Sequence, residues 1–190
     1  MNGLIIVVII IAVLLLIALA WAGIYNRLVK LRNWVEEAFA QIDVQLQKRN
    51  DLIPNLVNTV KGYAKHESET LEAVVKARQQ LVNLPSDASA AEINAHSNEL
   101  SGALSRLLVV AEQYPDLKAN TNFTQLQASL EEIEKQIAVA RQLFNSSVAQ
   151  YNTTIQSVPN NIVAGVHHFT KKEMLQAPEE ARAVPTVNFD

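Results

Sequence analysis

The chain begins with an unbroken apolar run. Residues Leu4 to Ala20 are all Leu, Ile, Val or Ala, and Trp21 follows directly. A helix rises about 1.5 Å per residue. With Trp21 and Ala22 included, about 19 residues reach about 28 Å, close to the ~30 Å hydrocarbon core of a bilayer. In lipid, a single segment must satisfy its own backbone hydrogen bonds, which requires a helix. The pattern predicts a transmembrane anchor over residues 1–23, held in the lipid bilayer via Leu4 to Trp21.

The residues that flank this run predict its orientation. Arg27, Lys30 and Arg32 follow the apolar run, and no Lys or Arg precedes it. The positive-inside bias therefore places the rest of the chain in the cytoplasm. A cleaved secretory signal remains the alternative, because Ala18–Ala20 has the small residues of a cleavage site. Such signals have a basic start and an apolar core of about 7–15 residues, and neither is present.

Beyond Gly23 the apolar pattern becomes periodic. Apolar residues advance in steps of three and four from Ile24 to Leu46, which forms a stripe along one face of a helix of coiled-coil type. Three later stretches repeat this pattern, and no stretch before the tail alternates with period two. We expect an all-α fold in which the transmembrane helix continues into an antiparallel up-and-down four-helix bundle. The bundle covers residues 24–159, with helices at about 24–50, 55–82, 90–114 and 122–158.

The polar cluster around Pro54 decides where the first bundle helix ends. Proline lacks a donor N–H and disfavours helical geometry at the residue before it. The chain can therefore turn at Asn50-Asp51 or continue through a kink. The turn is the preferred interpretation, because it yields four helices of comparable length, whereas a kink yields one helix much longer than its partners.

The helix caps and the C-terminal tail complete the predicted organisation. Ser86 and Asp87 are expected to cap the third helix, and Thr121 or Asn122 the fourth. Residues 160–190 are expected to be a partly ordered tail lying on the bundle, with an interfacial or partner-binding strip as the alternative. Within the tail, residues 162–169 are apolar without helical spacing. Thr170 and Glu173 have the spacing of a capping box, which predicts a short turn.

Composition and charge exclude several classes of function. The chain has no Cys, so disulfides, thiol catalysis and thiolate metal sites are excluded. The formal net charge of −3 gives no case for a nucleic-acid partner. His66-Glu67 resembles the start of a zinc motif, but the residue four positions after His66 is Thr70 rather than a second His. The adjacent pair His167-His168 has no carboxylate cluster nearby. We therefore predict no catalytic, cofactor-binding or metal-binding residue.

Two further groups of polar residues have a structural and a functional interpretation. Asp43, Arg49 and Asp51 are expected to form a hydrogen-bonded clasp that holds helix ends at the turn, in preference to a catalytic carboxylate pair. An aromatic–amide pair recurs three times and is expected to fix helix register, with recognition of a partner as the alternative. These pairs are Tyr25-Asn26, Phe144-Asn145 and Tyr151-Asn152.

Several longer stretches resemble the LemA family of bacterial membrane proteins. The matching segments include Tyr25–Val29, Glu37–Leu46, Arg49–Val57, Val60–Ala64 and Tyr114–Asn120. The resemblance implies a single-pass protein of the bacterial inner membrane, with a cytoplasmic-facing domain of four helices. The chain departs from the family pattern at Phe39, where we expect Trp, and at Asn50, where we expect His. The family has no agreed catalytic or binding residues, so none is carried over.

These observations favour a non-enzymatic function. We expect a membrane-anchored scaffold that forms a homo-oligomer or binds membrane-associated proteins. The alternative is a regulatory or sensory module that relays a change between membrane and cytoplasm by a helix shift at Pro54. An enzyme would need titratable groups that converge in a pocket, and the sequence shows no such set.

Overall fold

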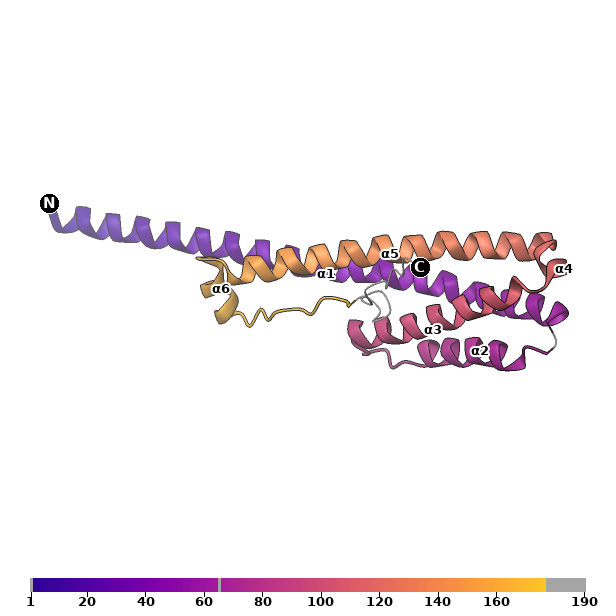
Figure 1. Cartoon of the computed structure of the whole chain (residues 1–190). Coiled ribbons are helices and arrows are strands. Elements are labelled where there is room, and N and C mark those ends of the chain that lie inside the picture. Colours follow the sequence, from indigo (N-terminus) through magenta and orange to yellow (C-terminus); the bar gives the residue numbers. More distant parts are fainter. Residues whose placement is uncertain (1, 65, 177–190) are drawn as a thin grey trace, which may run out of the picture. The chain divides into compact units, whose positions relative to one another are not determined.

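The computed structural model describes residues 2–64 and 66–176. Within these ranges there are six helices and no strand, so the prediction of an all-α fold is confirmed (Figure 1). The helices are α1 (Asn2–Tyr63), α2 (Ser68–Val82), α3 (Ala90–Ala111), α4 (Pro115–Lys118), α5 (Thr121–Gln156) and α6 (Asn160–Val166). The chain divides into two compact units. The first comprises Met1–Ala38 and Leu143–Met174, and the second comprises Phe39–Gln142 and Leu175–Asp190, so that α1 and α5 contribute to both.

The first unit contains the apolar run and a short helical core. Side chains of the run are exposed along its whole length, between 48% at Val13 and 76% at Leu4 for the large residues. Further along α1 the stripe becomes buried, with Leu28 and Val35 at its centre. In the same unit α5 buries Val148 and Tyr151, and the two helices lie side by side. The unit therefore has a protein core only beyond the apolar run.

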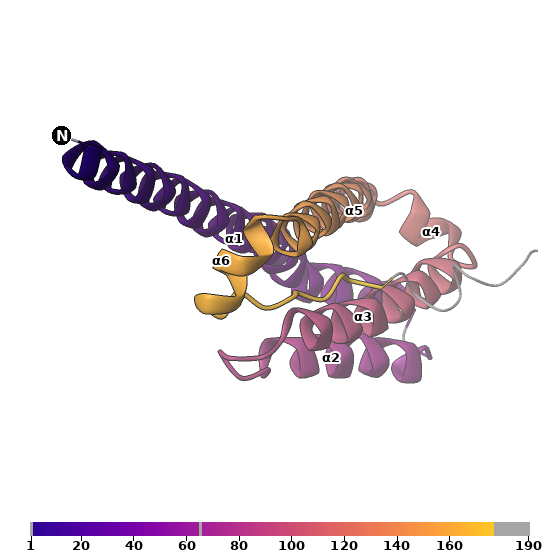
Figure 2. The ribbon, with the colours of Figure 1, turned by 90° about the vertical axis from the view of Figure 1, so that its left-hand side faces the viewer.

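The second unit is a bundle of four helical segments. The C-terminal part of α1, then α2, α3 and the N-terminal part of α5 follow one another in alternating directions (Figures 1 and 2). The periodic stripes of all four segments meet in a single hydrophobic core, and the short α4 adds Leu117 to it. The other core residues are Ile53, Leu56, Val60, Ala64, Leu71, Val74, Ala77, Leu81, Leu100, Ala103, Leu104, Leu107, Ala111, Phe123 and Leu130.

The turn expected at Asn50-Asp51 was wrong. Helix α1 continues through Pro54 to Tyr63, and the chain turns between Tyr63 and Ser68 instead. Pro54 lies on the exposed face, while its neighbours Ile53 and Leu56 on the stripe are buried in the core. Burial of this stripe outweighs the loss of one helical hydrogen bond, which is the local cost of the proline.

A side chain from α2 compensates for that missing bond. In an uninterrupted helix, the N–H of residue 54 would donate to the carbonyl of Asn50. Proline has no N–H, and Arg78 Nε donates to this carbonyl at 2.9 Å. The carbonyl is therefore satisfied from outside the helix, which explains how α1 passes through Pro54 without leaving a buried acceptor unpaired.

The helix caps also differ from the prediction. Helix α3 is capped by Ser89, which forms a reciprocal capping box with Glu92, and not by Ser86 or Asp87. At the start of α5 the cap is Asn120, whose side-chain oxygen accepts the backbone N–H groups of residues 122 and 123 at 2.9 and 3.1 Å. Each true cap lies within a few residues of the expected one, as is usual for helix ends assigned from sequence.

The tail differs from the prediction in two places. Residues 160–166 form α6, with Val163 and Ala164 buried. The short turn expected at Thr170 and Glu173 is absent, because residues 169–176 have no regular secondary structure and their polar groups bond to α5 instead. The predicted tail from residue 177 onward lies outside the described residues.

Candidate functional site

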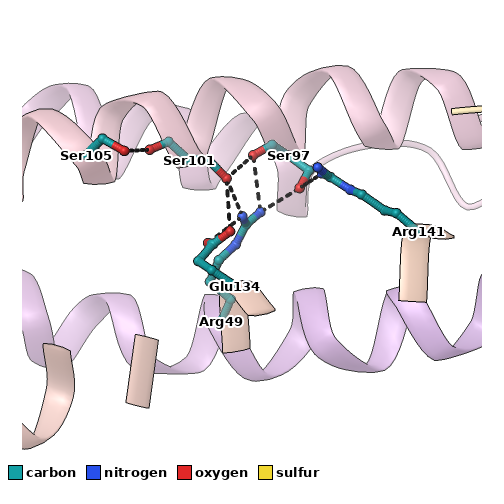
Figure 3. Close-up of polar contacts among 6 residues, drawn as sticks. All are labelled: Arg49, Ser97, Ser101, Ser105, Glu134 and Arg141. Atoms are coloured by element: carbon teal, nitrogen blue, oxygen red, sulfur yellow. Dashed lines mark hydrogen bonds and ion pairs between the residues drawn. The ribbon is translucent and has the colours of Figure 1, made fainter. Parts of the chain in front are cut away.

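A buried polar layer interrupts the apolar core of the second unit (Figure 3). Arg49 occupies a stripe position on α1 between Leu46 and Ile53, and its side chain is fully buried. Its guanidinium donates to Ser101 Oγ at 2.9 Å and to Glu134 Oε1 at 3.0 Å through Nη1. Through Nη2 it donates to Ser97 Oγ at 2.9 Å. The layer consequently joins α1, α3 and α5.

A second arginine enters the same layer from α5. Arg141 Nη2 also donates to Ser97 Oγ, at 2.9 Å. Burial is the main cause that lowers the pKa of Arg141, the neighbouring Arg49 lowers it further, and Glu134 opposes the shift. The Nε atoms of both arginines are buried and have no hydrogen-bond partner among the described residues. Two guanidinium groups therefore meet at Ser97, and only Arg49 is paired with Glu134, whose side chain is 36% exposed.

This layer is suited to fixing helix register. A buried polar group is satisfied in only one alignment of the helices, so sliding α1 against α3 or α5 would leave Arg49 unpaired. The layer contains hydroxyls, one carboxylate and two guanidinium groups. His96, which precedes Ser97 in the sequence, contacts Glu99 on the surface at 3.1 Å rather than either serine hydroxyl of the layer. Its geometry supports alignment of the helices rather than nucleophilic chemistry.

The clasp expected among Asp43, Arg49 and Asp51 was wrong. The three residues lie on one continuous helix, and only Arg49 faces the core. Asp51 accepts a hydrogen bond from Gln47 Nε2 at 3.0 Å on the surface, and Asp43 is exposed. The sequence signal for the true arrangement was the position of Arg49, which is in phase with the apolar stripe. Its partners on α3 and α5 had no comparable signal.

An aromatic cluster, here called the aromatic collar, lies against one side of α1 directly after the apolar run. We use this name for Trp21 and Tyr25 of α1 together with His167 and Phe169, which follow α6. Trp21 Nε1 donates to His167 Nε2 at 3.2 Å. The Tyr25 ring centroid lies 4.6 Å from that of His167 and 6.0 Å from that of Phe169. The guanidinium carbon of Arg32 lies 5.4 Å from the Phe169 centroid, within cation–π range.

One of the aromatic–amide pairs holds the segment that follows α6. Tyr151 Oη donates to the Thr170 carbonyl at 3.0 Å. Asn152 bonds the backbone of Lys172 at both ends of its amide, with Nδ2 donating at 2.8 Å and Oδ1 accepting at 3.0 Å. Burial raises the pKa of Tyr151 and is the largest cause of the shift. This pair therefore fixes the tail on α5, a role the sequence did not indicate.

The corner between α1 and α2 contains the residues that resembled a zinc motif. Glu67 Oε1 accepts from Tyr114 Oη at 3.0 Å, and this bond is the largest cause that raises the pKa of Tyr114. Asn120 Nδ2 donates to Tyr63 Oη at 2.8 Å. Within residues 2–64 and 66–176, no three His, Asp or Glu side chains are grouped so that they could hold a metal ion. The motif-like residues here connect the corner to the segment around α4.

The surface of the second unit has two grooves of interest. The α1–α2 groove is lined by Val57, Lys61, Ser68, Leu71, Glu72, Val75, Lys76 and Gln79. A second groove contains Phe39 and Asn50, the two positions that depart from the expected family pattern. The side-chain oxygen of Asn50 is buried and has no hydrogen-bond partner among the described residues.

The fold and these contacts define an all-α protein in which a long N-terminal helix, apolar and long enough to cross a membrane, continues into a helical bundle. Its polar clusters hold helices and tail together. The sequence profile of the LemA family matches residues 38–189, which is most of the chain. The protein therefore belongs to the LemA family.

Three relatives give the range of similarity. Protein LemA of Metamycoplasma hominis is 26% identical over 163 residues, covering 85% of this chain and 73% of the relative. Magnetosome protein MamQ of Magnetospirillum gryphiswaldense is 27% identical over 172 residues, covering 78% of this chain and 63% of MamQ. Magnetosome protein MamQ 2 of Paramagnetospirillum magneticum is 26% identical, with 80% and 64% covered. The chain thus spans slightly less than two thirds of the MamQ proteins.

Proposed function

We propose that this protein is a membrane-anchored helical-bundle scaffold that self-assembles or binds membrane-associated proteins and catalyses no reaction. The observation that carries the proposal is the exposed apolar run of α1, which continues without interruption into a folded bundle. Such a surface is unfavourable in water and favourable in hydrocarbon. The bundle is therefore held at a membrane by the helix that also forms part of its core.

The charges beside the run support a cytoplasmic bundle on a bacterial inner membrane. Arg27 and Lys30 are exposed just beyond Trp21, on the side that the positive-inside bias assigns to the cytoplasm. If the run were instead a cleaved signal, cleavage after Ala20 would remove it and leave Trp21 at the new N-terminus. Intact mass spectrometry of the protein from membranes separates these cases, and the anchor requires the apolar run to be retained.

The α1–α2 groove is the surface best suited to a protein partner. Its apolar part is formed by Val57, Leu71 and Val75, and charged side chains such as Lys61 and Glu72 lie at the same groove. An amphipathic helix can place its apolar face in a groove of this kind, with its polar residues against the charged positions. Anchoring in a membrane confines the copies and raises their effective concentration, so weak contacts suffice for assembly.

The names of the relatives agree with a structural role. Two of them are named magnetosome proteins, which assigns those proteins to a cellular structure and names no reaction. The polar contacts described above likewise consist of helix and tail contacts. Together they favour binding over catalysis for this chain.

The experiment measures the mass of the full-length protein in detergent by light scattering. Val75→Glu places a charge in the α1–α2 groove, and Val109→Glu is the matched control, because Val109 is 65% exposed on α3. The wild type should exceed the mass of one chain plus its micelle, Val75→Glu should reduce it, and Val109→Glu should not. A strictly monomeric wild type, also without crosslinks to itself or to other proteins in native membranes, would refute the proposal.

A regulatory or sensory role is the second candidate, and one observation favours it. Helix α1 is unbroken from the apolar run through Pro54, and Arg78 of α2 bonds to its backbone beside the proline. A displacement of α1 would therefore strain a defined contact in the bundle. In this case Pro54→Ala should change partner capture in membranes while the helical content of the domain, measured by circular dichroism, stays the same.

A further inference from the structure

The exposed side of α6 carries apolar residues that no part of the described protein covers. Val163 and Ala164 face inward and are buried. Ile162 and Val166 lie four residues apart, hence on one face of the helix, and are 57% and 59% exposed. Val158, just before α6, is 80% exposed. We call Ile162 and Val166 the apolar face of α6, and Val158 lies in the turn that precedes it.

The aromatic collar holds α6 at the end of the apolar run. His167, which directly follows α6, accepts a hydrogen bond from Trp21, the first residue after the run. Figures 1 and 2 show α6 beside α1, and the apolar part of α1 extends beyond it. Seven residues of helix span about 10 Å, so α6 extends about two helical turns from His167, which contacts Trp21. If α1 spans a bilayer, the level of Trp21 is the boundary between hydrocarbon and headgroups.

The charged residues closest in sequence to the two ends of this contact are positive. Residues 21–35 contain Arg27, Lys30 and Arg32 and no Asp or Glu, and residues 157–172 contain Lys171 and Lys172 and again no Asp or Glu. Of these five cations, Lys172 is paired with Glu36 and Arg32 lies over the Phe169 ring, while Arg27, Lys30 and Lys171 are exposed. The first acidic residue along α1 is Glu36, which lies 3.4 Å from the Lys172 ammonium. An apolar helix face flanked by Lys and Arg is the pattern of a helix that lies in the interface of an anionic membrane.

We propose that α6 is a second membrane contact, a foot that inserts its apolar face into the headgroup boundary of the bilayer that α1 spans, with the exposed cations Arg27, Lys30 and Lys171 against anionic lipid. The Trp21–His167 hydrogen bond couples the foot to the anchor, and Tyr151 and Asn152 couple the segment after it to α5. Two contacts restrict the tilt and rotation of α1 in the bilayer, which a single helix alone does not. This inference rests on the proposed membrane anchor and goes beyond the scaffold role.

The absence of Cys in the chain makes a direct test possible. Full-length Ile162→Cys and Val166→Cys variants are each labelled with a nitroxide in vesicles of phosphatidylcholine with phosphatidylglycerol. Electron paramagnetic resonance then compares collisions with oxygen, which concentrates in lipid, and with a water-soluble nickel chelate. Leu14→Cys reports the anchor. Val109→Cys, on the exposed surface of the second unit, reports a site in water.

We expect the ratio of oxygen to nickel accessibility at positions 162 and 166 to be several-fold higher than at position 109, and lower than at position 14. The ratio should fall in vesicles of phosphatidylcholine alone, and an unchanged ratio there would overturn the role of the cations. If positions 162 and 166 match position 109 while position 14 remains in lipid, the foot is wrong and the anchor stands. If positions 162 and 166 are shielded from both reagents, protein covers the face and the foot is again wrong. A water-accessible position 14 overturns the anchor and the foot together.

Discussion

The bond between Arg78 and the Asn50 carbonyl leads to a quantitative prediction about Pro54. Arg78 Nε donates at 2.9 Å to the acceptor that Pro54 leaves without its helical partner. Replacing Pro54 by Ala restores an N–H that can donate to the same carbonyl. The two substitutions Pro54→Ala and Arg78→Ala should therefore be coupled, and a double-mutant cycle measures that coupling.

The expected magnitudes follow from the burial of the bond. A hydrogen bond that involves a charged group contributes about 1.5–3 kcal/mol, and this partly buried one should lie near the lower end, about 1.5 kcal/mol. In the Pro54→Ala background the carbonyl keeps a donor, so Arg78→Ala should then cost about 0.5 kcal/mol, as an ordinary surface substitution does. The coupling free energy is thus about 1 kcal/mol, above the ~0.3–0.5 kcal/mol scatter of independent sites.

Pro54→Ala alone should raise the stability of the protein. Proline in a helix interior costs about 3 kcal/mol relative to Ala. Part of this gain is offset because Ala makes the unfolded chain more flexible, by about 0.4–1 kcal/mol. In the wild type Arg78 already satisfies the Asn50 carbonyl, which removes about 1 kcal/mol of the gain, so a net gain of about 1–2 kcal/mol is expected.

The assay is urea unfolding of the full-length chain in one fixed detergent, followed by circular dichroism. Lys76→Ala is the matched control, because Lys76 is an exposed cation on the same helix as Arg78. It should show no coupling to Pro54→Ala. If Arg78→Ala lowers the free energy of unfolding equally in the wild-type and Pro54→Ala backgrounds, Arg78 does not replace the missing hydrogen bond. The explanation of how α1 continues through Pro54 is then wrong.

The buried layer and one helix cap give the remaining predictions. Arg49→Ala should lower the free energy of unfolding by about 3 kcal/mol, since it removes a fully buried side chain with its hydrogen bonds to Ser97 and Ser101 and its ion pair with the partly exposed Glu134. The exposed control Arg106→Ala should stay within about 0.5 kcal/mol in the same urea titration, and equal effects would refute the register role. Hydrogen bonds from Ser89 lower the pKa of Glu92 below its ordinary value of 4.5. The ionised Glu92 carboxylate therefore contributes to folding stability above pH 4.5, and this contribution is lost as the pH falls through the lower folded-state pKa. Glu92→Gln should flatten the fall in stability below pH 4.5, and an unchanged slope contradicts this.

Local patterns along the chain were sufficient to predict the helices and the apolar run. A continuous run such as Leu4–Ala20 and stripes in steps of three and four depend only on residues close in sequence, so they can be recognised without knowing any partner. The all-α class and the bundle stripes followed from these patterns. Family membership was likewise visible in stretches such as Arg49–Val57.

The contacts between helices needed the tertiary structure. Local chemistry favours a turn near Pro54, but the helix continues because burial of Ile53 and Leu56 and a bond from α2 act there together. Arg49 could be seen in the stripe, while its partners Ser97 and Glu134 lie far along the chain and carry no pattern that names them.

The same distinction applies to the tail. The segment Asn160–Val166 is too short for a periodic pattern to identify it as a helix, and it is held through His167 by contacts with Trp21 and Tyr25. Periodicity shows which side of a helix will be buried, because that depends on neighbours a few residues away. Which element packs against that side depends on residues that meet only when the chain folds. These long-range contacts decided that α1 continues through Pro54 and where α6 lies.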